Sequence, residues 1–227
     1  MNNLDELQEI LGYKFKNINF LENALCHTSY AHENFNKIKS NERLEFLGDT
    51  VLNLIISERI YNNKNEINEG NMSKIRATVI CEECLYEAAL RLQYDKFILL
   101  GNGEEKLGGR GKASILSDAF EAVLAAIYLD GGFEVSQGFI NRVLGEVTDN
   151  AVYKLGEKDH KTKLQEVIQS VSNEKISYEI IGETGPDHQK SYVAVVKLGS
   201  KILGKGTGSS KKEAEQNAAD EALKQDI

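Results

Sequence analysis

The chain has 227 residues, a formal net charge of −8 and 41% hydrophobic residues, a length that suits one large domain or two smaller ones. Its first residues are acidic where a secretory signal would be basic, and its longest apolar stretch is far too short to span a bilayer. Three cysteines give an odd count with no disulfide framework. The composition therefore argues against a secreted disulfide-rich protein and a membrane protein, and favours the cytoplasm.

Two kinds of pattern divide the chain near residue 150. Before that point the apolar residues follow helical spacing, interrupted by glycine-rich connectors such as Gly101–Gly111. The predicted helices are Leu4–Leu11, Leu21–Ala31, Asn41–Tyr61, Met72–Leu90, Ser114–Leu129 and Phe139–Val152. We therefore predict an all-α N-terminal domain over residues 1–152.

The rest of the chain follows a different pattern. A polar stretch predicts a linker over residues 153–160, and residues 161–227 combine helix and strand signals. Helices are predicted at Thr162–Val171 and Lys211–Leu223, and strands near Ile176–Ile181, Ser191–Leu198 and Lys201–Lys205. This α-β-β-β-α order predicts a small α+β domain, with two helices on one face of a three-stranded antiparallel sheet.

The helix predicted at Asn41–Tyr61 carries an unusual set of acids. Glu42, Glu45 and Asp49 are spaced i, i+3 and i+7, so they share one helix face. An exposed acidic stripe would explain them without any function. However, the flanking Phe46 and Leu52 indicate a helix covered on most sides, where unpaired carboxylates are costly and a metal ion is the usual remedy.

A second acidic pair, Asp118 and Glu121, lies one turn apart on the helix predicted at Ser114–Leu129. Ala122 and Ala125 continue its face and would permit close approach of another helix, although a contact stripe of small residues explains them equally well. Four carboxylates from two helices would supply only oxygen ligands, which suit Mg²⁺ or Mn²⁺ rather than zinc. Spacing alone cannot show that the two pairs meet.

The segment Cys81-Glu82-Glu83-Cys84 is a Cys-X-X-Cys pair inside the helix predicted at Met72–Leu90. No second cysteine pair and no histidine pair accompanies it. We therefore interpret it as structural rather than as a zinc or redox site.

The negative net charge argues against a nucleic-acid binder until the charge is divided. Residues 1–154 carry 16 basic and 23 acidic side chains, whereas residues 155–227 carry 11 and 12. Within the second part, residues 188–212 contain six lysines and no acid. Such a local basic surface can bind a polyanion inside an acidic chain, although solvated strand edges would carry similar lysines.

The segment Asn41–Asp49, Asn-Glu-Arg-Leu-Glu-Phe-Leu-Gly-Asp, resembles the signature of the ribonuclease III family. The run Gly-Ser-Ser-Lys-Lys-Glu-Ala-Glu at residues 208–215 resembles the double-stranded RNA-binding domain that follows the nuclease domain in the bacterial members. Further segments similar to the family are Gln8–Phe15, His27–Glu33, Glu69–Ala77, Gly109–Asp118 and Asp118–Asp130. The resemblance covers the whole chain. It implies an endoribonuclease that hydrolyses double-stranded RNA to 5′-phosphate and 3′-hydroxyl ends with short 3′ overhangs.

The same resemblance implies roles for individual acids. It makes Glu45, Asp49, Asp118 and Glu121 the catalytic ligands of Mg²⁺ or Mn²⁺, a role in which the metal activates the attacking water. Glu42 and Glu69 match accessory acids near the scissile phosphate. Asn68 and Asn71 stand where relatives often have acids, and His160 stands where the linker often has another residue, but these departures remove no principal ligand.

The partners implied are double-stranded RNA and a second copy of the chain, without a membrane or a small-molecule organic cofactor. Precursors of ribosomal RNA and structured messenger RNAs are the expected substrates.

The alternative is a catalytically silent RNA-binding protein on the same scaffold, which should have lost metal ligands. No Ser-His-Asp or Cys-His arrangement favours a covalent intermediate. Arg76, Arg110 and Lys112 are candidate phosphate contacts, although surface solvation explains each of them better.

Several residues of the C-terminal domain are predicted to contact RNA. Short hydrogen-bonding side chains suit the 2′-hydroxyls of an RNA minor groove, and one face of the helix at Thr162–Val171 carries Thr162, Gln165, Glu166 and Gln169. A plain solvated face would look similar. Lys211 and Lys212 begin the last helix, where free amides and the helix dipole add to their charge, and Ser210 with Glu213 fits a capping box. By the resemblance, the loop of His188 reaches a second minor groove.

The apolar residues beside the acids predict a homodimer. Phe46, Leu52 and Ile56 flank the acidic face, and exposed apolar patches often mark subunit contacts. A twofold dimer would match the approximate dyad of duplex RNA. Together with the family resemblance, this predicts one active centre in each subunit.

Overall fold

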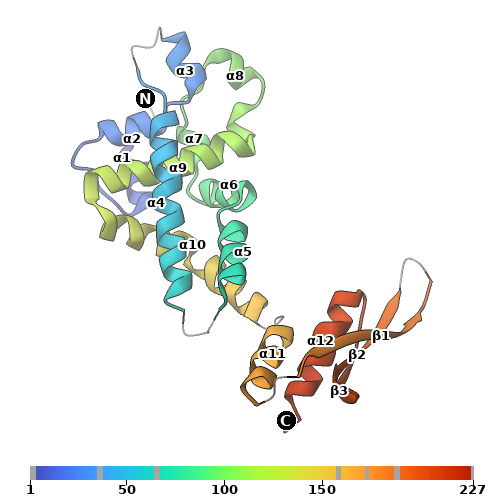
Figure 1. Ribbon diagram of the computed structural model, residues 1–227. Helices are drawn as coiled ribbons and strands as arrows, with labels where there is room; N and C mark the ends of the chain where they lie inside the picture. The colour runs from blue at the N-terminus through green and yellow to red at the C-terminus, as the bar shows by residue number, and fades with distance from the viewer. Residues whose placement is uncertain are drawn as a thin grey trace. The chain divides into compact units, whose positions relative to one another are not determined.

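The structure, a computed structural model, describes residues 4–34, 38–63, 67–156, 160–171, 174–186 and 190–225. The chain divides into two compact units, Met1–Tyr153 and Lys154–Ile227. The first unit is helical and the second is mixed (Figure 1), so the predicted fold class is confirmed. In the described part of the chain, no helix combines the length and apolarity needed to cross a membrane.

Helix α9 (Ala113–Gly131) forms the centre of the N-terminal unit. From Ile115 to Ile127 every residue is buried except Asp118 and Glu121, so the helix is surrounded by other helices on most sides. Helices α2, α4 and α6 pack against it. The remaining elements of the unit are α1 (Leu4–Leu11), α2 (Asn19–Ala24), α3 (Thr28–Glu33), α4 (Glu42–Tyr61), α5 (Glu69–Val79), α6 (Glu82–Arg91), α7 (Tyr94–Phe97), α8 (Asn102–Lys106), η1 (Gly109–Gly111) and α10 (Phe133–Gly156).

Two helices predicted as continuous are broken in the structure. The helix predicted at Leu21–Ala31 splits into α2 and α3 because Cys26 leaves helical geometry to pair with Leu99, and His27 then caps α3. The helix predicted at Met72–Leu90 splits into α5 and α6, because Cys81 adopts an extended backbone. The breaks follow tertiary contacts and backbone geometry that apolar spacing does not report.

Other boundaries also differ from the prediction. The glycine-rich connector Gly101–Gly111 contains the short helices α8 and η1, and α10 begins at Phe133 rather than Phe139. Helix α10 extends to Gly156 and α11 (His160–Val171) begins four residues later.

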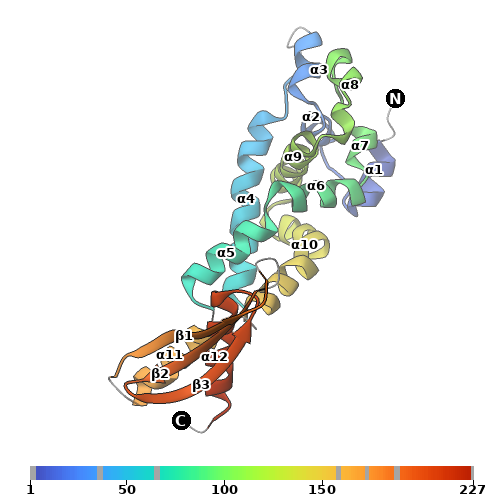
Figure 2. The ribbon, with the colours of Figure 1, turned by 90° about the vertical axis from the view of Figure 1, so that its right-hand side faces the viewer.

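The C-terminal unit is an antiparallel sheet covered on one face by two helices. Its strands β1 (Ile176–Thr184), β2 (Ser191–Leu198) and β3 (Lys201–Gly208) are ordered β1-β2-β3. Figure 2 looks onto this sheet, with α11 and α12 (Lys211–Leu223) behind it. A two-residue turn, Gly199-Ser200, joins β2 to β3, and Gly199 supplies its positive φ of 57°.

The contact between β3 and α12 depends on small residues on both elements. A Cβ added to Gly204 or Gly206 would lie 2.4 or 2.2 Å from backbone atoms of Ala218. The helix meets these glycines with buried alanines, Ala214, Ala218, Ala219 and Ala222. The backbones therefore approach more closely than larger side chains would allow, and this packing holds the start of α12 at the end of β3.

Candidate active site and RNA-binding surface

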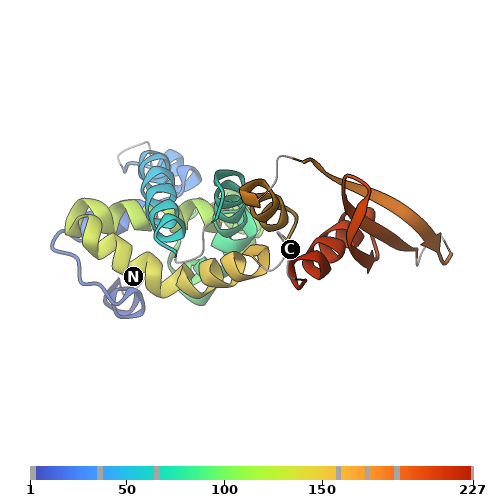
Figure 3. The ribbon, with the colours of Figure 1, turned by 60° about the horizontal axis from the view of Figure 1, so that its bottom comes forward.

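Helices α4 and α9 cross in direct backbone contact at Gly48. A Cβ added to Gly48 would lie 1.9 Å from the carbonyl oxygen of Glu121, so only glycine fits there without displacing a helix. The crossing can be followed in Figures 1 and 3, where α4 is light blue and α9 is yellow-green. Asp49 directly follows Gly48, and Glu45 lies one turn before Asp49. The contact therefore brings the acidic pair of α4 toward Asp118 and Glu121 of α9.

The four acids influence one another electrostatically. Burial, followed by the charges of Asp49, Glu45 and Asp118, raises the pKa of Glu121 to about 8. Burial, and then Asp118, Glu42 and Asp49, likewise raises the pKa of Glu45 above its ordinary value. Glu45 and Glu121 are partly buried, and burial together with the neighbouring charges favours their protonated forms when no cation is near.

Protein cations do not neutralise this cluster. Among the described residues, Glu45, Asp49, Asp118 and Glu121 form no ion pair with a lysine or an arginine. The amide of Asn53 donates to Asp49 Oδ1 at 2.8 Å. In the described part of the chain, no group of three or more His, Cys, Asp or Glu side chains stands in an arrangement ready to hold a metal ion. The cluster is thus an unpaired set of oxygen donors.

The other predicted polar residues lie in different surroundings. Glu42 belongs to the cluster electrostatically through Glu45, and it accepts a hydrogen bond from Ser40 Oγ at 2.6 Å. Glu69 begins α5 and lines a separate cavity of about 410 Å³ with Leu54, Tyr61 and Arg76. Glu42 therefore influences Glu45, whereas Glu69 lies beside the second half of α4.

The three candidate phosphate contacts are engaged within the protein. Arg110 pairs with Glu105 at 2.6 Å and donates to two backbone carbonyls, so it holds the segment before α9. Lys112 pairs with Glu104 at 2.5 Å, and Arg76 donates to Ser57 Oγ at 2.9 Å.

Two further residues next to the cluster were not singled out from the sequence. His27, the N-cap of α3, interacts electrostatically with Asp118 and Glu42, although burial is the largest effect and lowers its pKa. Burial of Asp118 is the largest cause that raises its pKa, and the negative charge of Glu82 is the second. His27 lies inside a segment that resembles the family, and Glu82 lies between the two cysteines, but neither position carries a spacing signal toward the acids.

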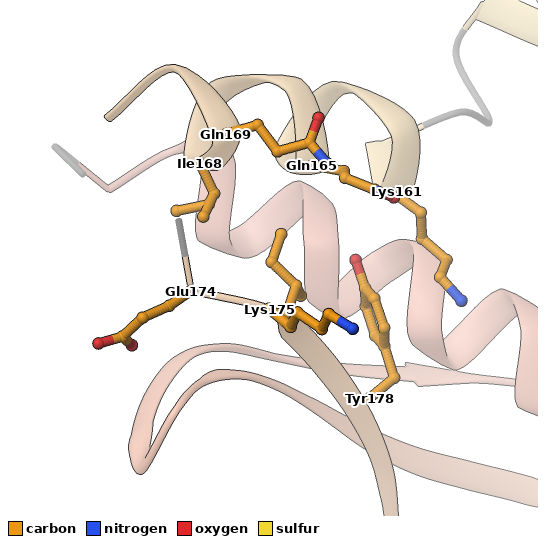
Figure 4. Close-up of a pocket in the computed structure, with 8 residues that line it drawn as sticks. Lys161, Gln165, Ile168, Gln169, Glu174, Lys175 and Tyr178 are labelled. Atoms are coloured by element: carbon orange, nitrogen blue, oxygen red, sulfur yellow. The ribbon is translucent and has the colours of Figure 1, made fainter. Parts of the chain in front are cut away.

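The predicted polar face of α11 is accessible. Gln165, Glu166 and Gln169 are exposed and Thr162 is half-buried. Gln165 and Gln169 line a cavity of about 560 Å³ between α11 and the start of β1, with Lys161, Lys175 and Tyr178 among its other lining residues. Figure 4 shows the Tyr178 side chain rising from β1 toward α11. The Lys161 ammonium lies 4.0 Å from the centre of its ring, a cation–π contact.

The start of α12 presents two exposed lysines. Ser210 is the N-cap, and its side chain accepts a hydrogen bond from the Glu213 amide at 3.2 Å. The Glu213 carboxylate accepts a hydrogen bond from the amide of Ser209 at 2.8 Å. In a standard capping box it would accept from the amide of Ser210, so the predicted box is shifted by one residue. Lys211 and Lys212 are exposed in the first turn, and His188 lies outside the described residues.

The apolar residues of α4 differ from the prediction. Leu52 and Ile56 are fully buried inside the subunit, so they cannot contribute to a subunit contact. The exposed apolar residues of the helix are instead Phe46, Leu54 and Tyr61, with exposed fractions of 78%, 56% and 76%. The prediction of an apolar surface beside the acids therefore holds for Phe46 alone among the three residues proposed.

Comparison with known proteins follows the division into two units. A ribonuclease-III-like family model matches residues 17–147, and a double-stranded RNA binding motif matches residues 160–225. Ribonuclease 3 of Caldanaerobacter subterraneus subsp. tengcongensis is 49% identical over 220 residues, which cover 97% of this chain and 96% of the relative. This chain belongs to the ribonuclease III family.

Further members of the ribonuclease III family are similar over comparable lengths. Ribonuclease 3 of Listeria monocytogenes is 44% identical over 224 residues, covering 98% of this chain and 97% of the relative. Among solved structures, the nuclease domain of ribonuclease III from Campylobacter jejuni is 40% identical with a TM-score of 0.60, covering 63% of this chain and 97% of that domain. That structure is described as showing flexibility in a region involved in dimer formation.

The predicted activity class is confirmed. A ribonuclease III nuclease domain joined to a double-stranded RNA binding motif makes this chain an endoribonuclease of double-stranded RNA. The catalytically silent alternative is not favoured, because the relatives that match along the whole chain are ribonucleases.

Proposed function

We propose that this ribonuclease III uses Glu45, Asp49, Asp118 and Glu121 to hold Mg²⁺, with Mn²⁺ as a substitute, at the crossing of α4 and α9. The observation that carries the proposal is the partly buried, mutually repelling carboxylates assembled around Gly48 without a protein cation. Carboxylate oxygens without nitrogen or sulfur suit a hard divalent ion. A cation would remove the repulsion that raises the pKa of Glu121, so the donor set fits the metal.

When bound, the metal lowers the pKa of a water molecule and stabilises charge on the attacked phosphate. The chain's own contribution is position: α9 is fixed by burial on most sides, and Gly48 sets its distance from α4. Glu42 and His27 adjoin the principal acids and influence their charge. We assign Glu42 and Glu69 to supporting roles near the scissile phosphate, Glu69 from its place beside α4.

We assign RNA binding to the C-terminal unit, through the exposed face of α11 and the first turn of α12. Gln165, Glu166 and Gln169 offer hydrogen bonds to 2′-hydroxyls and base edges, and Lys211 and Lys212 offer charge to phosphates. Such recognition depends on A-form shape more than on sequence. Thr162 and His188 complete the proposed set. Long duplexes in ribosomal RNA precursors and structured messenger RNAs, cut to 5′-phosphate ends with short 3′ overhangs, are the proposed substrates and products.

The decisive experiment compares Glu121→Gln with Glu146→Gln on perfect duplex RNA. Glu121→Gln keeps the side-chain size but removes a charge from the metal site, so we expect cleavage to fall by at least about a hundredfold while RNA affinity changes little. Glu146 is exposed on α10, and its substitution should leave cleavage unchanged. Ca²⁺ in place of Mg²⁺ should support binding without cleavage. Wild-type turnover by Glu121→Gln at saturating Mg²⁺ would refute the assignment of the ligands.

We also propose a homodimer in which each subunit cuts one strand. The support is the exposed apolar surface of α4, formed by Phe46, Leu54 and Tyr61, in a helix that also carries two of the acids. A cavity of about 680 Å³ beside the start of this helix is lined in part by Leu44, Leu47 and Leu129. A second copy presenting the same surface would cover these groups and relate the two sites by a twofold axis.

Sedimentation tests the dimer. Phe46→Asp should dissociate it, whereas Leu107→Asp, an equally exposed leucine at the end of α8, should leave it intact. Mixed dimers of one wild-type and one Glu121→Gln subunit, isolated with two affinity tags, should nick a single strand of each duplex. An active monomer, or mixed dimers that cut both strands at the wild-type rate, would overturn the model.

We also propose a reducing cytoplasm as the compartment, which suits the free thiols of all three cysteines.

A further inference from the structure

Cys81 and Cys84 lie at the N-terminus of helix α6 rather than inside a continuous helix. Helix α5 ends at Val79 and α6 begins at Glu82, so Cys81 is the N-cap, with an extended backbone at φ −68° and ψ 154°. Cys84 is the third residue of the helix. The N-cap and the third helical residue lie on the same side of the first turn, so the break in the helix places Cys81 and Cys84 at neighbouring positions.

The two thiols differ in exposure. Both are free, and they stand three residues apart at the start of α6. Cys81 is exposed, whereas Cys84 is half-buried and its Sγ donates to the carbonyl of Thr78 at 3.3 Å. Burial is the largest cause that raises the pKa of Cys84 to about 11. One thiol therefore meets solvent, and the other stands protonated behind it.

A zinc site is the main rival explanation for such a pair. A structural zinc ion needs four ligands, usually from cysteine and histidine. Within the residue ranges that the structure describes, no further cysteine or histidine is grouped with Cys81 and Cys84 in an arrangement for a metal ion. The pair thus lacks the further ligands that zinc requires, whereas a disulfide requires only the two sulfurs.

We propose that Cys81 and Cys84 form a reversible dithiol–disulfide site that reacts with low-molecular-weight disulfides such as oxidised glutathione. The Cys81 thiolate attacks one sulfur of the oxidant, whose S–S bond breaks to release one glutathione thiolate, which takes up a proton. Cys84 then loses its proton to solvent, and its sulfur attacks Cys81 Sγ and displaces the second glutathione thiolate. The cysteine pair is oxidised by two electrons, and the oxidant is reduced to two thiols.

The site borders the carboxylate cluster of the nuclease. Glu82, which lies between the two cysteines, is the charge that, after burial, raises the pKa of Asp118. Closure of the disulfide would tie the N-cap to the first turn of α6 and so restrain the backbone that carries Glu82. The third cysteine, Cys26, is fully buried in the same unit and serves as an internal control.

The test exposes the full-length, reduced protein to buffers of graded oxidised-to-reduced glutathione, followed by acid quenching, alkylation under denaturing conditions and peptide mass spectrometry. We expect wild type to lose the alkylation of Cys81 and Cys84 together and to yield a cross-linked peptide. Dithiothreitol should restore both thiols, and Cys26 should be alkylated throughout. In Cys84→Ser, Cys81 should instead accumulate as a mixed disulfide with glutathione, since the resolving thiol is gone.

Three results would overturn the proposal. They are glutathione held on Cys81 of wild type without closure of the ring, an unmodified Cys81 in Cys84→Ser, and a Cys26 that reacts as fast as Cys81. Cys26→Ser is the matched substitution, and it should form the same cross-linked peptide at the same glutathione ratio as wild type. Far-ultraviolet circular dichroism of each variant confirms that a missing reaction does not come from misfolding.

Discussion

The two units of this ribonuclease III treat their carboxylates in opposite ways. In the C-terminal unit acids are paired with lysines: Glu183 with Lys190 at 2.7 Å, Asp220 with Lys224 at 2.7 Å and Glu215 with Lys161 at 2.8 Å. Hydrogen bonds from Lys190 and Lys224 hold the pKa values of Glu183 and Asp220 below their ordinary range. In the N-terminal unit the pKa values of Glu45, Asp118 and Glu121 are raised instead, with burial as the largest cause.

The difference separates a solvated surface from a site. Exposed ion pairs of the first kind contribute little to stability, typically up to about 1 kcal/mol. Carboxylates that are partly buried together without a cation make the free protein less stable, and such arrangements concentrate where function requires them. The raised pKa values of Glu45, Asp118 and Glu121 therefore support our proposal that a cation binds there.

The largest test of this contrast is Gly48→Ala. The added Cβ would lie 1.9 Å from the Glu121 carbonyl oxygen, so α4 and α9 must move apart. Displacement of catalytic groups by about 1 Å can cost roughly a hundredfold in rate, and we expect a loss of cleavage of at least that order. Overpacking should also lower the free energy of unfolding by about 1–3 kcal/mol. Single-turnover cleavage and urea unfolding measure the two effects.

Gly138→Ala is the matched control for this experiment. Gly138 also lies within a helix, α10, but a Cβ added there meets nothing within 4 Å. Alanine should therefore preserve cleavage and stabilise the helix by about 0.5–1 kcal/mol. Normal cleavage by Gly48→Ala would show that the α4–α9 contact does not assemble the carboxylates. The contact would then not explain why carboxylate pKa values are raised in the N-terminal unit and lowered in the C-terminal unit.

Local patterns predicted much of this site. The spacing of Glu45 with Asp49, and of Asp118 with Glu121, was enough to place each pair on one helix face, because side-chain direction in a helix depends only on sequence separation. The N-cap at Ser210 was likewise local, since its hydrogen bond spans three residues. The order of helices and strands followed from the apolar period.

Long-range contacts account for what the sequence did not reveal. Ala122 and Ala125 indicated that another helix could approach α9, but the sequence did not identify Gly48 as the contact on α4, because its partner Glu121 lies far along the chain. Leu52 and Ile56 were taken as candidate subunit contacts, because periodicity cannot distinguish a face buried inside a subunit from one buried between subunits. The break before Cys81 carries no proline or glycine, so no local signal marks it.

The next prediction sharpens the C-terminal side of the comparison, where some lysines are free of acids. Lys211 and Lys212 are exposed, and neither forms an ion pair with a residue in the described ranges. We expect Lys211→Ala with Lys212→Ala to weaken duplex binding about tenfold and to reduce the slope of log affinity against log salt by about one to two, since fewer counterions are released. Fluorescence anisotropy over a range of KCl concentrations measures both.

A charge-matched variant isolates the effect of position. Lys201→Ala with Lys205→Ala removes the same charge from exposed positions of β3, and we expect a much smaller change in slope. Equal slopes for the two double variants would mean that the lysines act only through net charge. An unchanged slope for the Lys211 and Lys212 variant would show that the start of α12 does not meet the RNA backbone.

The smallest expected effect concerns the metal-free protein, where the unmet charge of the N-terminal site should appear as a dependence of stability on pH. The pKa of Glu121 rises from 4.5 to about 8 on folding, mainly through burial and then through Asp49, Glu45 and Asp118. Between these values the folded state binds a proton that the unfolded state lacks, so stability is greatest below about pH 4.5 and falls as the pH rises through about 8. Glu121→Gln cannot lose this proton.

In EDTA, Glu121→Gln should therefore melt at least about 2 °C above wild type at pH 9, the shift that roughly 1 kcal/mol produces in a domain of this size. The advantage should shrink as the pH falls toward 5, where wild-type Glu121 is protonated in the fold. Adding Mg²⁺ at pH 8 should reverse the order, because wild type gains stability by binding the ion and the variant binds it more weakly. Parallel melting curves for the two proteins at every pH would mean that Glu121 does not share its surroundings with the other carboxylates, since a solvated glutamate would keep its ordinary pKa and lose no stability across this range.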